Sequence, residues 1–131
     1  MVRYLIDTHC WLWLLTSPER LPAGLLSHLE DPRNELLLSA ASSWEIAIKY
    51  MLGKLQLPEP PHAYVPGRME ATGTRGLPVT HAHALRVADL PRHHRDPFDR
   101  LLVAQAQLEH LVLVTADRQF RQYDVPVRFA G

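Results

Sequence analysis

Short apolar runs rich in β-branched residues alternate along the chain with segments of helical periodicity, and this alternation narrows the folds that the chain can adopt. Turn-forming residues bound the apolar runs, which predict β-strands at residues 2–6, 35–39, 77–79, 111–114 and 125–129. The helical patterns between them are HCWLWLLT, PAGLLSHLED, SSWEIAIKYML and DPFDRLLVAQAQLEHL. Strands that alternate with helices are typical of α/β folds, so we expect a mainly parallel sheet covered by helices.

One stretch departs from this alternation. PEPPHAYVPG contains four prolines in ten residues, and proline fixes φ and lacks a backbone N–H. The stretch therefore predicts a rigid connection or a lid, too short to separate two domains. A chain of 131 residues is expected to form a single domain over residues 1–131.

The charges of the chain are balanced, with 14 Lys and Arg against 14 Asp and Glu. Without an excess of positive charge, any contact with a nucleic acid must be local. Cys10 is the single cysteine, which excludes an internal disulfide and fits a reducing compartment. We find no signal-peptide pattern and no apolar run of ~20 residues, so we expect a cytoplasmic protein that does not span a membrane.

Two aspartates follow apolar strands. Asp7 ends VRYLID, and Asp117 ends LVLVTAD. In open α/β sheets, ligands bind outside the carboxyl ends of the strands, so both acids are expected at one edge of the sheet. Burying an acid such as Asp7 between an apolar strand and an apolar helix is costly unless a positive group meets it. These positions raise the hypothesis of a shared site.

The aspartates also have a purely structural interpretation. Asp117 can open a helix that Thr115 caps. Asp96 before Pro97 has the pattern of an N-cap followed by proline in the first helical position. Asp99 would then lie in the first turn, where a carboxylate interacts favourably with the helix dipole.

Glu45 lies three residues after Ser42, which is the spacing of a capping box. If that helix begins nearer Ser39, however, Glu45 lies inside it and is beyond capping reach. Glu45 and the three aspartates could then converge, and such a cluster would raise the pKa of some members unless cations compensate. Mg²⁺ binds carboxylates together with water, and such ions can activate water for attack on a phosphodiester.

Four motifs occur in a fixed order along the chain: YLIDTHCWLWLL, SAASSWEIAIK, HRDPFDRLLVAQA and LVTADRQF. Together they resemble the PIN-domain family, specifically the VapC-like toxins of bacterial toxin–antitoxin pairs, over nearly the whole chain. The resemblance implies a PIN-like three-layer α/β/α fold with a mainly parallel central sheet. It also implies an Mg²⁺- or Mn²⁺-dependent endoribonuclease whose catalytic, metal-binding acids are Asp7, Glu45, Asp99 and Asp117.

The resemblance extends to supporting residues and partners. Thr115 stands two positions before the fourth acid, as is common in the family, and Asp96 is a neighbour that could assist. The implied substrate is RNA, hydrolysed to products that end in 5′-phosphate and 3′-hydroxyl. The implied assembly is a homodimer, inhibited by a cognate VapB-like antitoxin that occludes the site.

The segment RHHRDPFDR gathers cationic and imidazole side chains beside two acids, namely those of Arg92, His93, His94, Arg95 and Arg100. One interpretation is a solvated loop. The other is a cationic rim that holds RNA phosphates near the metal, with the three arginines as RNA-binding residues.

The tryptophans are expected in the core or on a partner surface. Trp11 and Trp13 lie two positions apart, so on a helix they point about 200° away from each other. One of them is therefore expected to contact a partner. Trp44 falls at helical spacing with Ile48.

Other chemistries have weaker support in the sequence. A zinc site from His81 and His83, or from the adjacent histidines of RHHR with Cys10, has no paired-cysteine motif. Asp7 could be the covalent nucleophile of a phosphatase-like hydrolase, although DTH lacks the second acid two residues on. A non-catalytic binding module, whose acids only cap helices, is a further alternative.

Overall fold

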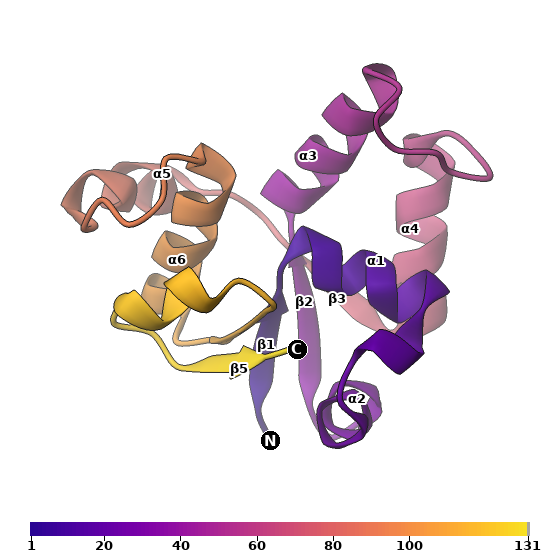
Figure 1. Ribbon diagram of the computed structural model, residues 1–131, viewed down its shortest axis with the longest axis horizontal. Helices are drawn as coiled ribbons and strands as arrows, with labels where there is room; N and C mark the ends of the chain where they lie inside the picture. The colour runs from indigo at the N-terminus through magenta and orange to yellow at the C-terminus, as the bar shows by residue number, and fades with distance from the viewer. Residues whose placement is uncertain (131) are drawn as a thin grey trace.

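The computed structural model describes residues 1–130 and contains a sheet of parallel strands in the order β3-β2-β1-β4-β5 (Figure 1). The strands are β1 (Arg3–Ile6), β2 (Glu35–Ser39), β3 (Thr74–Leu77), β4 (Val112–Thr115) and β5 (Val127–Phe129). Every pairing in this sheet is parallel, so the predicted mainly parallel sheet is confirmed.

Side chains from both faces of the central strands are buried, which explains why these strands are continuous apolar runs. On β2, Leu36 and Leu38 join one hydrophobic core, whereas Leu37 joins the other. Tyr4 and Ile6 on β1 divide from Leu5 in the same way, because successive side chains of a strand point to opposite faces.

Helices cover both faces of the sheet (Figure 1). The α-helices are α1 (Thr8–Thr16), α2 (Ala23–Glu30), α3 (Ala40–Met51), α4 (Pro61–Thr72), α5 (His81–Arg86) and α6 (Pro97–Glu109). Short 3-10 helices are η1 (Pro18–Arg20), η2 (Val87–Asp89) and η3 (Arg118–Gln122). One core packs residues of α1 to α4 against the sheet, and the other packs α6 and η3. The three-layer α/β/α prediction is therefore confirmed.

The strand order creates a topological switch point beside β1. From β1 the chain proceeds to β2 and β3 on one side, and β4 and β5 are then added on the other. The carboxyl ends of β1 and β4 flank the point of reversal, which is where ligands bind in sheets of this kind. Asp7 directly follows β1, and Asp117 lies two residues after β4.

Two local predictions were wrong. The proline-rich stretch is not a connection, because α4 begins at Pro61 and contains Pro66. Proline is tolerated in a first helical turn, and the buried side chains of Tyr64 and Val65 hold the helix against the core despite Pro66. The third strand covers Thr74–Leu77 rather than 77–79, since it pairs with β2.

The interpretation of Ser42 and Glu45 as a capping box was also wrong. Ser39 is the N-cap of α3, and its hydroxyl accepts a hydrogen bond from Ala41 N at 3.0 Å. Glu45 consequently lies in the second turn. The buried Ser42 hydroxyl has no hydrogen-bond partner among residues 1–130.

The tryptophans have different surroundings. Trp11 is fully buried and donates from Nε1 to Thr74 Oγ1 at 3.2 Å, whereas Trp13 is partly buried beneath the guanidinium of Arg20. Trp44 is 63% exposed and meets Phe98 edge to face, so it is not a core residue. Within the described part of the chain, no helix has the length and apolar character needed to cross a membrane.

Candidate metal centre

Asp7 is fixed at the end of β1 by two hydrogen bonds. Its Oδ1 accepts from Cys10 N at 2.8 Å, which makes Asp7 the N-cap of α1. Its Oδ2 accepts from Thr115 Oγ1 at 2.5 Å. The burial cost that the sequence indicates is therefore offset by hydrogen-bond donors in the protein, and the carboxylate is held in one orientation.

Thr115 joins Asp7 to Asp117. The buried Thr115 hydroxyl donates to Asp7 and accepts from Asp117 N at 3.1 Å. One interpretation predicted that Thr115 caps the following helix, and this was wrong. Asp117 is the N-cap of η3, and its Oδ1 accepts a hydrogen bond from Gln119 N at 2.9 Å. The two aspartates thus belong to one hydrogen-bonded unit built from the ends of β1 and β4.

Asp99 faces the same space from the first turn of α6. The N-cap of that helix is Asp96, which accepts from Phe98 N at 2.8 Å, as predicted. Burial, together with the charges of Asp96, Asp117 and Asp7, raises the pKa of Asp99 to about 7 against the opposing effect of His94. A carboxyl group with this pKa indicates a site short of positive charge.

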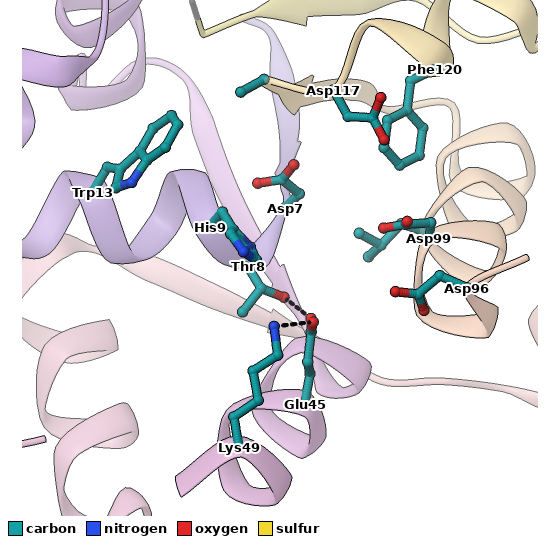
Figure 2. Close-up of a pocket in the computed structure, with 12 residues that line it drawn as sticks. Asp7, Thr8, His9, Trp13, Glu45, Lys49, Asp96, Asp99, Asp117 and Phe120 are labelled. Carbon is teal, nitrogen blue, oxygen red and sulfur yellow. Dashed lines mark hydrogen bonds and ion pairs between the residues drawn. The ribbon is translucent and has the colours of Figure 1, made fainter. Parts of the chain in front are cut away.

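These acids line a cleft of about 300 Å³. Figure 2 shows Asp7, Asp99 and Asp117 around this space, with Asp96 on the α6 side. Glu45 lines the cleft from α3, where its Oε1 accepts from Thr8 Oγ1 at 2.6 Å and its Oε2 lies 3.0 Å from Lys49 Nζ (Figure 2). The four predicted acids therefore share one cleft, where Lys49 partly neutralises Glu45.

A histidine completes the tightest group of possible metal ligands. Among residues 1–130, ligand atoms of His94, Asp99 and Asp117 all lie within 4.8 Å of one another. Neither interpretation of the RHHR segment, a solvated loop or a cationic rim, holds for His94, because its side chain is only 5% exposed. Nothing in the local sequence distinguishes His94 from His93; the packing of the loop against η3 makes the difference.

The alternative zinc sites do not form. His83 bonds to Glu109 through Nε2 and accepts from Thr80 N through Nδ1 within a capping box. Cys10 lies in the hydrophobic core, where burial raises the pKa of its thiol. Neither residue belongs to the group of possible ligands found among residues 1–130.

The predicted RNA-binding arginines fall into two kinds. Arg92 and Arg95 are exposed on the loop before α6. Arg100 instead donates to the carbonyl oxygens of Val87, Leu90 and Pro91 at 2.8, 3.3 and 2.9 Å. Its guanidinium therefore fastens this loop to α6, and only the other two remain candidates for the cationic rim.

Sequence reasoning missed several residues that line the cleft, namely Thr8, His9, Trp13, Lys49 and Phe120. Lys49 had a readable signal, because it follows Glu45 by four positions and such pairs face each other on a helix. Thr8 and Phe120 had none, since their contacts depend on how distant elements pack.

The donor set fits a divalent cation. Carboxylate oxygens suit Mg²⁺ and Mn²⁺, and an imidazole within reach adds affinity for transition metals. The raised pKa of Asp99 supports the same conclusion, because a cation would remove the repulsion among the aspartates. Asp7, Asp99 and Asp117, with His94 beside the last two, could hold such an ion.

Comparisons with known proteins identify the family of the chain. A model of the PIN domain matches residues 4–126. Ribonuclease VapC22 of Mycobacterium tuberculosis is 31% identical over 127 residues, which are 96% of this chain and 95% of the relative. Ribonuclease VapC16 of the same organism is 62% identical over 55 residues, 42% of this chain and 39% of that relative, so this match spans less than half of its length.

The fold itself has a close counterpart. The crystal structure of VapBC2 from Rickettsia felis, bound to a DNA fragment from its promoter, matches with a TM-score of 0.75 at 14% identity, covering 99% of this chain and 100% of that chain. At this identity the likeness concerns the fold. Taken with the family match over residues 4–126, it shows that the chain belongs to the PIN-domain family as a VapC-like member.

Proposed function

We propose that this chain is a divalent-metal-dependent endoribonuclease and the toxin of a VapBC-type pair. The observation that carries the proposal is the convergence of Asp7, Asp99 and Asp117 on one cleft, where the pKa of Asp99 is raised to about 7. The names of the relatives, ribonucleases VapC16 and VapC22, support RNA as the substrate.

The residues of the cleft have distinct roles in this proposal. Asp99 and Asp117 would hold the ion with Asp7, whose hydrogen bonds to Thr115 and Cys10 N fix its orientation. A bound Mg²⁺ or Mn²⁺ supplies Lewis-acid activation of water and of the scissile phosphate. Glu45 contributes a fourth carboxylate whose charge is partly offset by Lys49, so it adds less repulsion than an unpaired acid would.

The loop before α6 supplies the contact with RNA. Arg92 and Arg95 are exposed close in sequence to Asp96, which lines the cleft. Because the chain has no excess positive charge, such a local pair is the way for it to approach a polyanion. Phosphates bound there would place a neighbouring phosphodiester at the acids.

Exposed apolar side chains on α3 and just after it support a protein partner. Trp44, Met51 and Leu52 are 63%, 74% and 58% exposed. Apolar surface of this kind marks contact sites. The partners we propose are a cognate VapB-like antitoxin and a second copy of the chain. Light scattering of the purified protein with and without the antitoxin tests both.

The decisive experiment is RNA cleavage by the purified protein in Mg²⁺, in Mn²⁺ and in EDTA. We expect cleavage with either metal and none in EDTA, and Asp99→Asn should be inactive while folded. Asp124→Asn is the matched control, because this exposed aspartate does not line the cleft. Undiminished cleavage by Asp99→Asn would contradict the proposal.

The same samples test the other functions. A phosphatase-like enzyme would trap a covalent phosphate on Asp7, which mass spectrometry of the protein after turnover would detect. A binding module would retain RNA without cleaving it, whatever the metal. The proposed nuclease leaves the protein unmodified and gives RNA fragments with 5′-phosphate ends.

A further inference from the structure

His94 is buried beside the carboxylate cluster although the acids alone would suffice to bind a metal. Its ring lies 4.5 Å from that of Phe120 and 5.4 Å from that of Tyr123, measured between centroids, and is nearly parallel to the latter. Only 5% of its side chain is exposed. Packing on two sides therefore fixes the plane of the imidazole.

Both ring nitrogens of His94 have hydrogen-bond partners. Nε2 lies 2.9 Å from Asp117 Oδ2, and Nδ1 lies 3.0 Å from the hydroxyl of Tyr123. An ionised carboxylate can only accept a hydrogen bond, so Nε2 carries the proton. In the neutral ring Nδ1 is then an acceptor, and the Tyr123 hydroxyl donates to it. A protonated ring would donate from both nitrogens, so His94 is the donor to Asp117 in either state.

This arrangement holds Asp117 from both sides. Its Oδ1 accepts from Gln119 N, and its Oδ2 accepts from His94. Its side chain is 41% exposed, so without the imidazole it would have freedom to rotate away from Asp99. Each carboxylate oxygen retains a lone pair for another partner.

We propose that Tyr123 and His94 form a positioning pair, which orients the Asp117 carboxylate toward a divalent ion while His94 itself does not coordinate that ion. The inference rests on the proposed metal-dependent function. Histidines that ligate metals are commonly oriented by a carboxylate behind them. Here the two roles are exchanged: the Asp117 carboxylate is the proposed ligand, and the His94 imidazole behind it sets its orientation.

The competing arrangement has His94 as a ligand through Nε2. That would require the proton on Nδ1, with Tyr123 as acceptor, and would bring the Nε2 lone pair against the Asp117 carboxylate at 2.9 Å. An imidazole ligand would also favour Mn²⁺ over Mg²⁺, because nitrogen ligands suit transition metals. The two arrangements therefore differ in proton position and in metal preference.

The experiment measures Mn²⁺ and Mg²⁺ affinity by titration calorimetry for the parent protein, His94→Gln, His94→Asn and Tyr123→Phe. The amide of Gln reaches about as far as Nε2 and can donate to Asp117, whereas the shorter Asn reaches only the Nδ1 position. We expect His94→Asn to weaken Mn²⁺ binding about 10–100-fold and His94→Gln to retain most of the affinity. Tyr123→Phe should lose less Mn²⁺ affinity than His94→Asn. The ratio of Mn²⁺ affinity to Mg²⁺ affinity should be the same in all four proteins.

Equal losses of Mn²⁺ affinity in the Gln and Asn variants would show that the imidazole is a ligand and overturn the proposal. A lower ratio of Mn²⁺ affinity to Mg²⁺ affinity in the variants than in the parent would have the same meaning. Unchanged affinity in folded His94→Asn would overturn it too. Should that variant not fold, unchanged affinity in Tyr123→Phe has the same force. A parent that binds neither ion removes the proposed function as well, which distinguishes the two failures. In ¹⁵N spectra of the Mg²⁺-loaded protein, an unprotonated Nε2 on His94 would also contradict the pair.

Discussion

Replacing Asp99 with asparagine should stabilise the protein when metal is absent. The substitution keeps the volume of the side chain and removes one charge from the cleft that Asp99 shares with Asp7 and Asp117. Most substitutions of a partly buried polar residue destabilise a protein, so a rise in melting temperature would be an unusual result. It follows here from the burial of Asp99 and from the neighbouring carboxylates, which together raise its pKa.

The magnitude follows from that pKa. The pKa of Asp99 moves from 3.8 to about 7 on folding, and one unit corresponds to roughly 1.4 kcal/mol, so the ionised form costs about 4 kcal/mol at most. The variant also loses the favourable interaction of the carboxylate with the dipole of α6, which destabilises it by about 0.3–1 kcal/mol. A net gain of at most about 3 kcal/mol remains, which corresponds to a rise in Tm of up to roughly 12 °C for a chain of this length.

The sign with pH is fixed by the direction of the shift. Because the pKa is higher in the folded state, the metal-free fold loses stability as pH rises from the ordinary aspartate range through about 7. The advantage of Asp99→Asn should therefore be full at pH 8 and shrink toward pH 5, where Asp99 in the parent is protonated.

The assay is thermal unfolding of the parent and Asp99→Asn in EDTA and in Mn²⁺, at pH 8 and pH 5, with Asp124→Asn as the exposed control. Mn²⁺ should stabilise the parent markedly, by about 2.7 kcal/mol at one hundred times its dissociation constant, and the variant less. A lower Tm for Asp99→Asn in EDTA at pH 8, together with no response of the parent to metal, would refute the shared metal site.

Four further predictions concern the remaining parts of the site and its surroundings. Glu45→Gln should remain folded and lose cleavage; normal cleavage with a lower Tm would instead make Glu45 a structural partner of its neighbours on α1 and α3. Neutralising Arg92 and Arg95 together should weaken RNA binding and flatten its dependence on salt, because fewer counterions are released. If RNA affinity across a salt titration is unchanged, the loop is a solvated surface without a role in RNA binding. Trp11→Ala should cost about 3–5 kcal/mol in denaturant unfolding as a lost core aromatic. Trp13→Ala should destabilise the fold less than Trp11→Ala, because Trp13 is only partly buried, and should weaken antitoxin binding by ~2 kcal/mol or more; equal binding would exclude it as an interface anchor.

The sheet could be predicted from the sequence because its central strands are buried on both faces. The run at 35–39 matches β2 residue for residue, and the apolar runs that end before Asp7 and Asp117 correspond to β1 and β4. Placing both acids at one edge then required only the rule that parallel strands share their carboxyl ends. That reasoning extends to the cleft, which the predicted acids do line.

The errors arose where tertiary packing outweighs local preference. The buried side chains of Tyr64 and Val65 hold α4 in a stretch that four prolines make unfavourable for a helix. Ser39 and Ser42 are both good N-caps, and the choice between them depends on where β2 ends. For Trp44 the sequence left a core position and a partner surface open, and its 63% exposure excludes the core.

The surroundings of the acids could not be predicted for a related reason. The bond between His94 and Asp117 joins residues 23 positions apart, and its partner Tyr123 is reached across η3. The Thr8 bond to Glu45 spans 37 positions. No local pattern encodes such pairs, so the sequence indicated which acids gather but not which neighbours orient them. Binding of Mg²⁺ or Mn²⁺ stays a prediction.

The contact between β1 and β4 joins two parts of the chain that are synthesised far apart in time. Thr115 and Asp7 are separated by 108 positions, and Asp7 N donates to Val114 O at 2.9 Å. A nascent chain that ends before β4 has neither these partners for Asp7 nor Asp117 itself. On the proposed function, unfinished copies on the ribosome would be inert, and nuclease activity would begin only when β4 leaves the ribosome and inserts beside β1. An antitoxin that recognises the folded cleft would then have no target on a copy that is still unfinished.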